Sequence, residues 1–518
     1  MLDRSRVSSL LLCLVLLAVA GSVARASSTT GVWEEKATVN ELALATAFAD
    51  PATGLSAGAK NLIGPRILRT ADAGNTWQSV LNTTPTLALA DVTWQDSNTA
   101  YAAGSGVKLF FNMNDSILKS SDRGITWQSV WNKGWFSYWT ELQVIKPGVV
   151  VAAGNWTPFL YTYYGIAYST DGGQTWEERK WNWNWDPMDT YAWPTDVHFL
   201  DENVGFLAGG VWPTTANEGV LGMPVNEHRP VDAGSTGEQW LAVAEVTTDG
   251  GHTWTTIFEQ PGFTLTDITF VNRNEGWVTG YYETGCCLAH GWIFHTQDGG
   301  LTWQQQFFGK EDVAAIQAIH MFNRREGWVA GYEDNQATAR TLLYHTTDGG
   351  ETWVEMDFHP FADPFDLFFF NESEGWTVGP NSAQMSKFLH YTDPDRTPKV
   401  TVTVTDHPQT YTPGSILPWT LNIRNVSGQT QQGDLWIYLA SPAIGMASPY
   451  PILLAQGVTL PAGANVNPTI PLPLPAWMPA GVYNIETVFG PFGTDDPLLH
   501  LAYDSFDVTF MPAAPDSH

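Results

Sequence analysis

Five acidic side chains recur at one position of a repeated pattern, and they are the residues of this chain best placed to act together. Each lies 13 residues before a glycine that ends an apolar segment; they are Asp91, Glu141, Asp196, Asp267 and Asp366. Converging carboxylates would attract a hard cation such as Ca²⁺, or would raise one another's pKa for acid–base work. The alternative is a repeat residue that bonds neighbouring backbone, and this structural role is the one we favour.

Aromatic side chains crowd three neighbouring loop regions and form a second candidate site. Exposed Trp and Tyr beside Asn and Asp suit sugar rings, and they equally suit a protein partner. The alternative is that the rings pack on one another and hold long loops that lack a core. The candidate ligand-binding residues are Trp131, Trp135, Tyr138, Trp139, Trp156, Tyr163, Trp181, Trp183, Trp185, Tyr191 and Trp193.

Two adjacent cysteines form a third candidate feature. Cys286 and Cys287 are the cysteines that remain beyond an N-terminal leader. In an exported protein they are predicted to close a strained ring disulfide with each other. Metal binding together with His290 is the alternative, although it has too few evident ligands.

The chain carries no recognisable catalytic set, and we assign no catalytic residue. It contains no Ser-His-Asp motif, phosphate loop or zinc pattern. We therefore expect a binding protein rather than an enzyme. A glycoside hydrolase or lyase with paired carboxylates stays open as the alternative, with candidates Glu141, Asp186, Asp189 and Asp196.

The elements that must position these residues follow from six copies of the pattern Ser/Thr-x-Asp-x-Gly-x-Thr-Trp. Their tryptophans lie 50, 49, 78, 49 and 50 residues apart, and a period of about 40–50 residues is typical of a propeller. Asp and Gly suit a tight turn, and Trp anchors the next strand. The aspartates of these boxes, which we assign a structural role, are Asp72, Asp122, Asp171, Asp249, Asp298 and Asp348.

Seven strands ending in Gly predict an all-β fold with a seven-bladed β-propeller. The seventh box is degenerate, so we expect the N-terminal segment 32–36 to supply the last strand and to remove two sheet edges. The five acids are expected to begin the innermost strands and to converge near the channel mouth. The insertion at 211–239 is expected to cover the aromatic surface.

Further segments flank the propeller. Residues 1–26 have the pattern of a signal peptide cleaved near Ala26, which predicts a secreted or periplasmic protein. The propeller is expected over 27–396, an immunoglobulin-like β-sandwich over 397–512 and a tail over 513–518. The net charge of −29 disfavours nucleic acid, and no segment predicts a membrane span. We expect a monomer that binds a protein or glycan partner.

The boxes, together with strands of the form Glu-Gly-Trp-Val-x-Gly, resemble the BNR/Asp-box propellers of the photosystem II assembly and stability factor type. The segment Thr347-Asp348-Gly-Gly-Glu-Thr-Trp353 is typical of that family, and the resemblance covers about residues 31–396. It implies a non-enzymatic seven-bladed propeller of lumen or periplasm. That family carries a basic patch, whereas this chain has few Lys and Arg, so the resemblance implies the architecture and not the photosynthetic partner.

Overall fold

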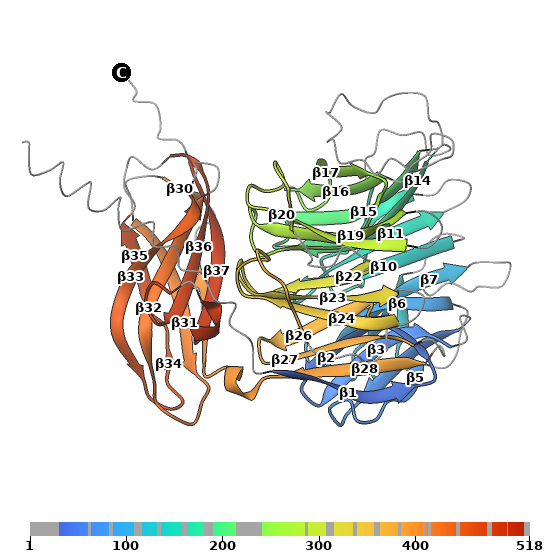
Figure 1. Ribbon diagram of the computed structural model, residues 1–518, viewed down its shortest axis with the longest axis horizontal. Helices are drawn as coiled ribbons and strands as arrows, with labels where there is room; N and C mark the ends of the chain where they lie inside the picture. The colour runs from blue at the N-terminus through green and yellow to red at the C-terminus, as the bar shows by residue number, and fades with distance from the viewer. Residues whose placement is uncertain are drawn as a thin grey trace, which may run out of the picture.

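The computed structural model shows an all-β chain (Figure 1). It describes residues 31–60, 64–81, 86–107, 117–131, 136–157, 163–180, 190–213, 241–284, 288–306, 315–334, 339–356, 363–381, 385–407, 410–412, 416–441, 446–473, 479–494 and 496–511. Within these residues the strands form seven four-stranded blades and a separate two-sheet sandwich. The predicted propeller and sandwich are confirmed. Residues 1–30, with the predicted signal peptide, lie outside the described part.

The first three blades follow chain order from the innermost strand outwards. They comprise β2 (Leu42–Asp50), β3 (Thr53–Ala59), β4 (Pro65–Thr70) and β5 (Gln78–Leu81); β6 (Thr86–Trp94), β7 (Ala100–Val107), β8 (Ile117–Ser120) and β9 (Gln128–Trp131); and β10 (Phe136–Lys146), β11 (Val149–Thr157), β12 (Tyr163–Ser169) and β13 (Glu177–Lys180). Blades two and three share one sheet, because the start of β10 also pairs with the end of β7.

The next three blades repeat the arrangement. They comprise β14 (Thr190–Phe199), β15 (Gly205–Pro213), β16 (Leu241–Thr247) and β17 (Thr255–Pro261); β18 (Phe263–Phe270), β19 (Gly276–Thr284), β20 (Leu288–Thr296) and β21 (Gln304–Gln306); and β22 (Ala315–Met321), β23 (Gly327–Asp334), β24 (Ala339–Thr346) and β25 (Val354–Glu355). Alanine, valine and leucine side chains of neighbouring blades pack into shared cores between the sheets.

The N-terminal strand closes the ring, as predicted. Blade seven consists of β26 (Asp366–Asn371), β27 (Glu374–Pro380), β28 (Ser386–Thr392) and β1 (Val32–Val39). Strand β1 pairs antiparallel with β28, with Trp33 opposite Tyr391. The Trp33 ring is buried and lies edge-on to Trp328 of blade six, at 5.7 Å between ring centroids. The start of the described chain therefore joins its last blade to the blade before it.

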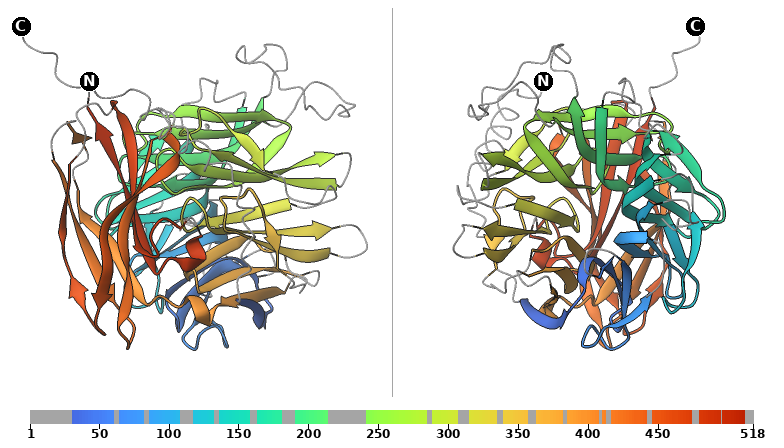
Figure 2. Two further views of the ribbon diagram at one scale, coloured as in Figure 1. Left: turned by 60° about the vertical axis from the view of Figure 1, so that its left-hand side comes forward. Right: turned by 90° about the vertical axis from the view of Figure 1, so that its right-hand side faces the viewer.

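The two ends of the propeller carry different connections. One end, which we call the box face, bears the Asp boxes and the turns between first and second strands. The other, the loop face, bears the connections between second and third strands and those between blades. The propeller is seen end-on in the right-hand view of Figure 2, with the sandwich behind its axis. The sandwich therefore lies against the box face.

The sandwich is built from two packed sheets. One holds β29 (Val400–Asp406), β31 (Ile416–Asn425), β34 (Asn465–Val466) and β35 (Thr469–Pro473); the other holds β30 (Thr410–Tyr411), β32 (Gln431–Ser441), β33 (Met446–Leu460), β36 (Gly481–Gly490) and β37 (Ala502–Phe510). Short 3₁₀ turns η1 (Pro394–Arg396) and η3 (Pro497–Leu499) precede β29 and β37. Buried residues of both sheets, including Trp419 and Tyr483, form one core.

Turns of the box face hold the sandwich in place. The Arg324 guanidinium lies between Glu486, with Nε 3.0 Å from Oε2, and the Tyr438 ring. The backbone N–H of Arg273 donates to Asp507 Oδ2 at 2.8 Å. The hydroxyl group of Tyr503 in the sandwich donates to the backbone carbonyl oxygen of Phe322 in the propeller, at 2.9 Å. Both side chains of the Arg324–Glu486 pair are about nine-tenths buried, so the contact is part of the folded core.

The recurring glycine has a physical cause in the innermost strands. Six of these strands carry a β-bulge one residue before the acid position, as between Leu265 and Asp267 in β18. The bulge turns the Thr264 carbonyl oxygen onto the backbone of Gly280 in β19, where a Cβ would overlap it. A bulge in one strand thus requires glycine in the next.

Replacing Gly280 with alanine should destabilise the propeller. A methyl group there would collide with backbone, so we expect a loss of about 1–3 kcal/mol in the free energy of unfolding. Gly428→Ala is the matched control, because a Cβ at that position would have nothing within 4 Å. Thermal denaturation of both variants tests this. Equal melting temperatures for the two would contradict the steric explanation.

Candidate functional site

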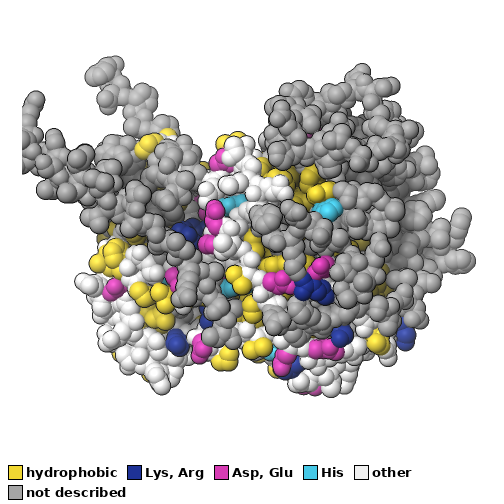
Figure 3. All heavy atoms as spheres, viewed as in Figure 1, with side chains coloured by type: hydrophobic (Ala, Val, Ile, Leu, Met, Phe, Trp, Pro, Cys, Tyr) yellow, Lys and Arg dark blue, Asp and Glu magenta, His cyan; other side chains and the backbone are white. Residues whose placement is uncertain are grey.

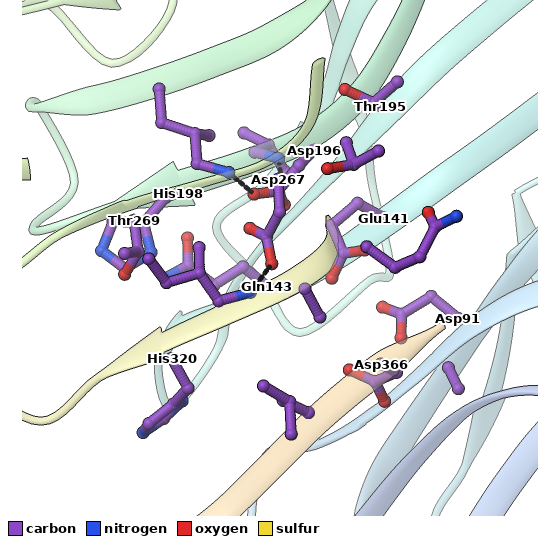
Figure 4. Close-up of a pocket in the computed structure, with 18 of the residues that line it drawn as sticks. Asp91, Glu141, Gln143, Thr195, Asp196, His198, Asp267, Thr269, His320 and Asp366 are labelled. Atoms are coloured by element: carbon purple, nitrogen blue, oxygen red, sulfur yellow. Dashed lines mark hydrogen bonds between the residues drawn. The ribbon is translucent and has the colours of Figure 1, made fainter. Parts of the chain in front are cut away.

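A cavity of about 560 Å³ runs along the propeller axis and is lined by the innermost strands of all seven blades. All five predicted acids face it, with Ala45 and Ala318 at the two remaining positions (Figure 4). One expectation is wrong. The acids do not begin their strands, except for Asp366; Glu141, for example, lies in the middle of β10. The other four acids therefore sit inside the channel rather than at its mouth, because their innermost strands start earlier than the sequence pattern indicated.

Four of the acids each bond their own blade to the next one in the ring. Oδ2 of the acid accepts the backbone N–H that directly follows the ring position in the next blade. These bonds run from Leu142 to Asp91 (2.8 Å), from Ile268 to Asp196 (2.9 Å), from Ile319 to Asp267 (2.8 Å) and from Thr46 to Asp366 (2.8 Å). The last crosses the closure between blades seven and one. We call these contacts the inter-blade locks.

Burial shifts four of the ring acids towards their neutral forms. Burial, with the charge of Asp366, raises the pKa of Asp91 to about 7. Burial raises the pKa of Asp366 to about 6. Burial also raises the pKa of Glu141, with the charge of Asp91, and that of Asp267, with the charge of Asp196. The backbone N–H groups favour the charged forms but do not offset the loss of hydration.

A second layer of polar side chains lies two residues further along the strands. Gln143 exchanges two hydrogen bonds with the backbone of Phe199 in the next blade, at 3.0 and 2.5 Å. His198 Nε2 lies 2.9 Å from the carbonyl oxygen of Phe270. Burial lowers the pKa of His198, and burial with the neighbouring His198 lowers that of His320 to about 4. Both rings are therefore neutral near pH 7.

The ring does not have the geometry of a metal site. Among the described residues, no group of three or more His, Cys, Asp or Glu side chains is arranged to hold a metal ion. One carboxylate oxygen of each of four ring acids instead accepts a backbone N–H group. These contacts are the ones that the structural role we favoured requires, and calcium binding by the ring stays a prediction.

The six Asp boxes are closed by their own hydrogen bonds. In the first, Asp72 accepts from the backbone N–H and the hydroxyl of Thr76, at 2.9 and 2.7 Å, and from the Thr70 hydroxyl at 2.8 Å. The Thr76 hydrogen bonds hold the pKa of Asp72 below its usual value. The boxes at Asp122, Asp171, Asp249, Asp298 and Asp348 repeat these contacts. Their carboxylates are turn-forming groups.

The aromatic candidates divide into three groups. Trp131 and Trp139 are buried against each other in the core between blades two and three. Their assignment as ligand-binding residues is therefore corrected, because both rings pack in the core. Burial raises the pKa of Tyr138, which lies beside them in β10. The backbones of Trp156, Tyr163, Tyr191 and Trp193 lie in β11, β12 and β14 towards the loop face. Trp135, Trp181, Trp183 and Trp185 lie outside the described residues, as do Cys286, Cys287, Asp186, Asp189 and most of the 211–239 insertion.

The Glu-Gly-Trp motif has a role that sequence reasoning missed. Glu326 is fully buried; its Oε1 lies 3.0 Å from His345 Nε2 and its Oε2 lies 2.8 Å from Arg396 Nη2. The Trp328 ring lies against the same His345 ring. Blades five and seven repeat the Glu–His–Trp contact. The available signal was a histidine three residues before the box aspartate in the three blades with a Glu-Gly-Trp motif, at His295, His345 and His390.

Residues 250–361 match the family model described as photosynthesis system II assembly factor YCF48, and residues 167–178 match the BNR/Asp-box repeat. Residues 167–178 thus form a BNR/Asp-box repeat, and residues 250–361 are similar to the photosystem II assembly factor family. No curated protein matches the chain.

On the side of the Asp-box propeller seen in Figure 3, Lys and Arg side chains are scattered singly among acidic ones. In the described part of the chain, no helix is long and apolar enough to cross a membrane.

Several solved structures are similar to the Asp-box propeller at low identity. YCF48 from Cyanidioschyzon merolae shares 14% identity over 70% of this chain and 98% of its own, with a TM-score of 0.45. The GH74 xyloglucanase from Xanthomonas campestris shares 13% over 76% of this chain and 59% of its own, also at 0.45. A PL25 ulvan lyase shares 11% over 70% of this chain and 95% of its own, at 0.44.

A chelator should leave the Asp-box propeller unchanged. Because the ring carboxylates accept from backbone N–H groups, we expect no change in melting temperature on adding excess EDTA, and none on adding millimolar Ca²⁺. A bound ion would instead stabilise the fold by mass action. Thermal denaturation and elemental analysis of the purified protein test this. A fall in melting temperature with EDTA that Ca²⁺ reverses would show that the ring holds the ion.

Proposed function

We propose that this chain is an exported, non-enzymatic Asp-box propeller that binds a protein or glycan partner on its loop face. The observation that carries the proposal is the set of inter-blade locks. Four of the five channel acids use a carboxylate oxygen to hold the backbone of the next blade. Groups held in this way maintain the ring and are poorly placed to attack or protonate a substrate.

The sandwich supports the choice of face. It occupies the box face through buried contacts such as Arg324–Glu486, so this end is not open to a large partner. The loop face bears the strands that lead into the aromatic loops. Trp and Tyr are the residues that most often anchor partners. The family model that matches residues 250–361 describes an assembly factor, which is consistent with a protein partner.

The alternative is a glycoside hydrolase or lyase, and one residue favours it. Within the described residues Glu141 accepts no inter-blade N–H bond. Burial and the charge of Asp91 raise the pKa of its carboxyl group. A carboxylic acid kept neutral beside a second carboxylate can act as a general acid. The two proposals therefore differ in whether Glu141 does chemistry.

A combined binding and turnover screen decides between them. The purified protein is tested on a glycan array, a peptide array and chromogenic glycosides. We expect binding without turnover, and at least about a tenfold weaker affinity for Trp183→Ala or Trp135→Ala, since anchor residues contribute about 2 kcal/mol or more. The exposed ring of Phe492 in the sandwich supplies the control, Phe492→Ala, which should bind normally.

Two outcomes would contradict the proposal. Turnover that Glu141→Gln abolishes would establish the enzyme alternative. Binding that survives both tryptophan substitutions would show that the partner does not use the aromatic loops.

A further inference from the structure

The ring acids form an unusual electrostatic arrangement inside the channel. Five carboxyl groups line one cavity, and no Lys or Arg lies among its described lining residues. The other titratable side chains in the lining are His198 on β14 and His320 on β22. These histidines are neutral near pH 7, because burial lowers the pKa of each, and they supply no counter-charge. The channel can therefore limit its negative charge in one way, by keeping protons on its carboxyl groups.

The ring acids of neighbouring blades act on one another's charge. In addition to burial, the charge of Asp91 in blade two raises the pKa of Glu141 in blade three. The charge of Asp196 in blade four adds to burial and raises the pKa of Asp267 in blade five in the same way. While one carboxyl group of such a pair keeps its proton, the two groups do not repel each other. Once the proton is lost, the like charges of the neighbouring blades repel.

We propose that the carboxyl ring makes closure of the propeller sensitive to pH, so that the blades are held together more tightly below neutrality than above it. The inter-blade locks lie at the same carboxyl groups, so charge that accumulates there acts directly on the contacts between blades. The proposal concerns stability of the ring and is independent of which partner the loop face binds.

The direction follows from proton linkage. An acid whose pKa is higher in the folded than in the unfolded state binds more protons when folded. Its contribution to stability is full below the unfolded pKa and is lost as pH rises through the folded pKa. Asp91, with a folded pKa of about 7, places this loss around neutrality. The neutral histidines act oppositely, since stability falls when they must be protonated, but only below about pH 6.5.

Between pH 6.5 and 8.5, the change in stability with pH therefore reports on the ring acids and not on the two channel histidines. We expect the unfolding equilibrium constant of the wild-type protein, measured by urea denaturation, to rise roughly tenfold or more across it. Glu141→Gln keeps the shape and hydrogen-bonding capacity of the side chain but removes one titrating group, so its rise should be several-fold smaller. The control Glu351→Gln removes an exposed carboxylate in an Asp box and should follow the wild type.

A second measurement needs no variant. Calorimetric unfolding at pH 7 in two buffers of different ionisation enthalpy counts the protons exchanged. We expect net release, because the ring acids give up protons when they become hydrated. No net release, or a wild-type pH dependence equal to that of Glu141→Gln, would overturn the proposal.

Discussion

The propeller depends on the bond between a carboxyl group in the channel and a backbone N–H of the next blade. In four blades a β-bulge directly precedes the channel acid, and the bulge also imposes glycine on the second strand. A blade alone cannot bury its faces, so the contact between neighbours is the unit of stability. At the closure, Asp366 and Thr46 form the same bond between distant parts of the chain, and β1 completes the last blade.

Much of this architecture could be predicted from the sequence, because turns and repeats are local signals. The boxes, the seven glycines and the N-terminal strand segment around Trp33 together indicated the ring and its closure. The depth of the acids was not predictable, since strand ends are set by pairing with neighbours. Nor was the burial of Trp131 and Trp139, because an aromatic residue near a loop looks the same in sequence whether it faces solvent or a neighbouring blade.

The position of the sandwich on the propeller could not be predicted from the sequence either. Arg324 and Glu486 are far apart in the chain and belong to different domains, and neither has a motif that indicates a partner. Their contact assigns different roles to the two ends of the propeller. The box face is an internal surface, and the loop face is the end on which we place binding. The channel between them is lined with acids that bond neighbouring blades.

The most direct test of this account is peptide-resolved amide hydrogen exchange across the innermost strands in the wild type and in Asp196→Ala. If the acids lock neighbouring blades, removing the Asp196 carboxyl group should speed exchange in the β18 peptide that contains Ile268. The β10 peptide that contains Leu142, which Asp91 holds, should keep its protection. Unchanged protection of Ile268 in the variant would contradict the claim that the channel acids hold the ring together.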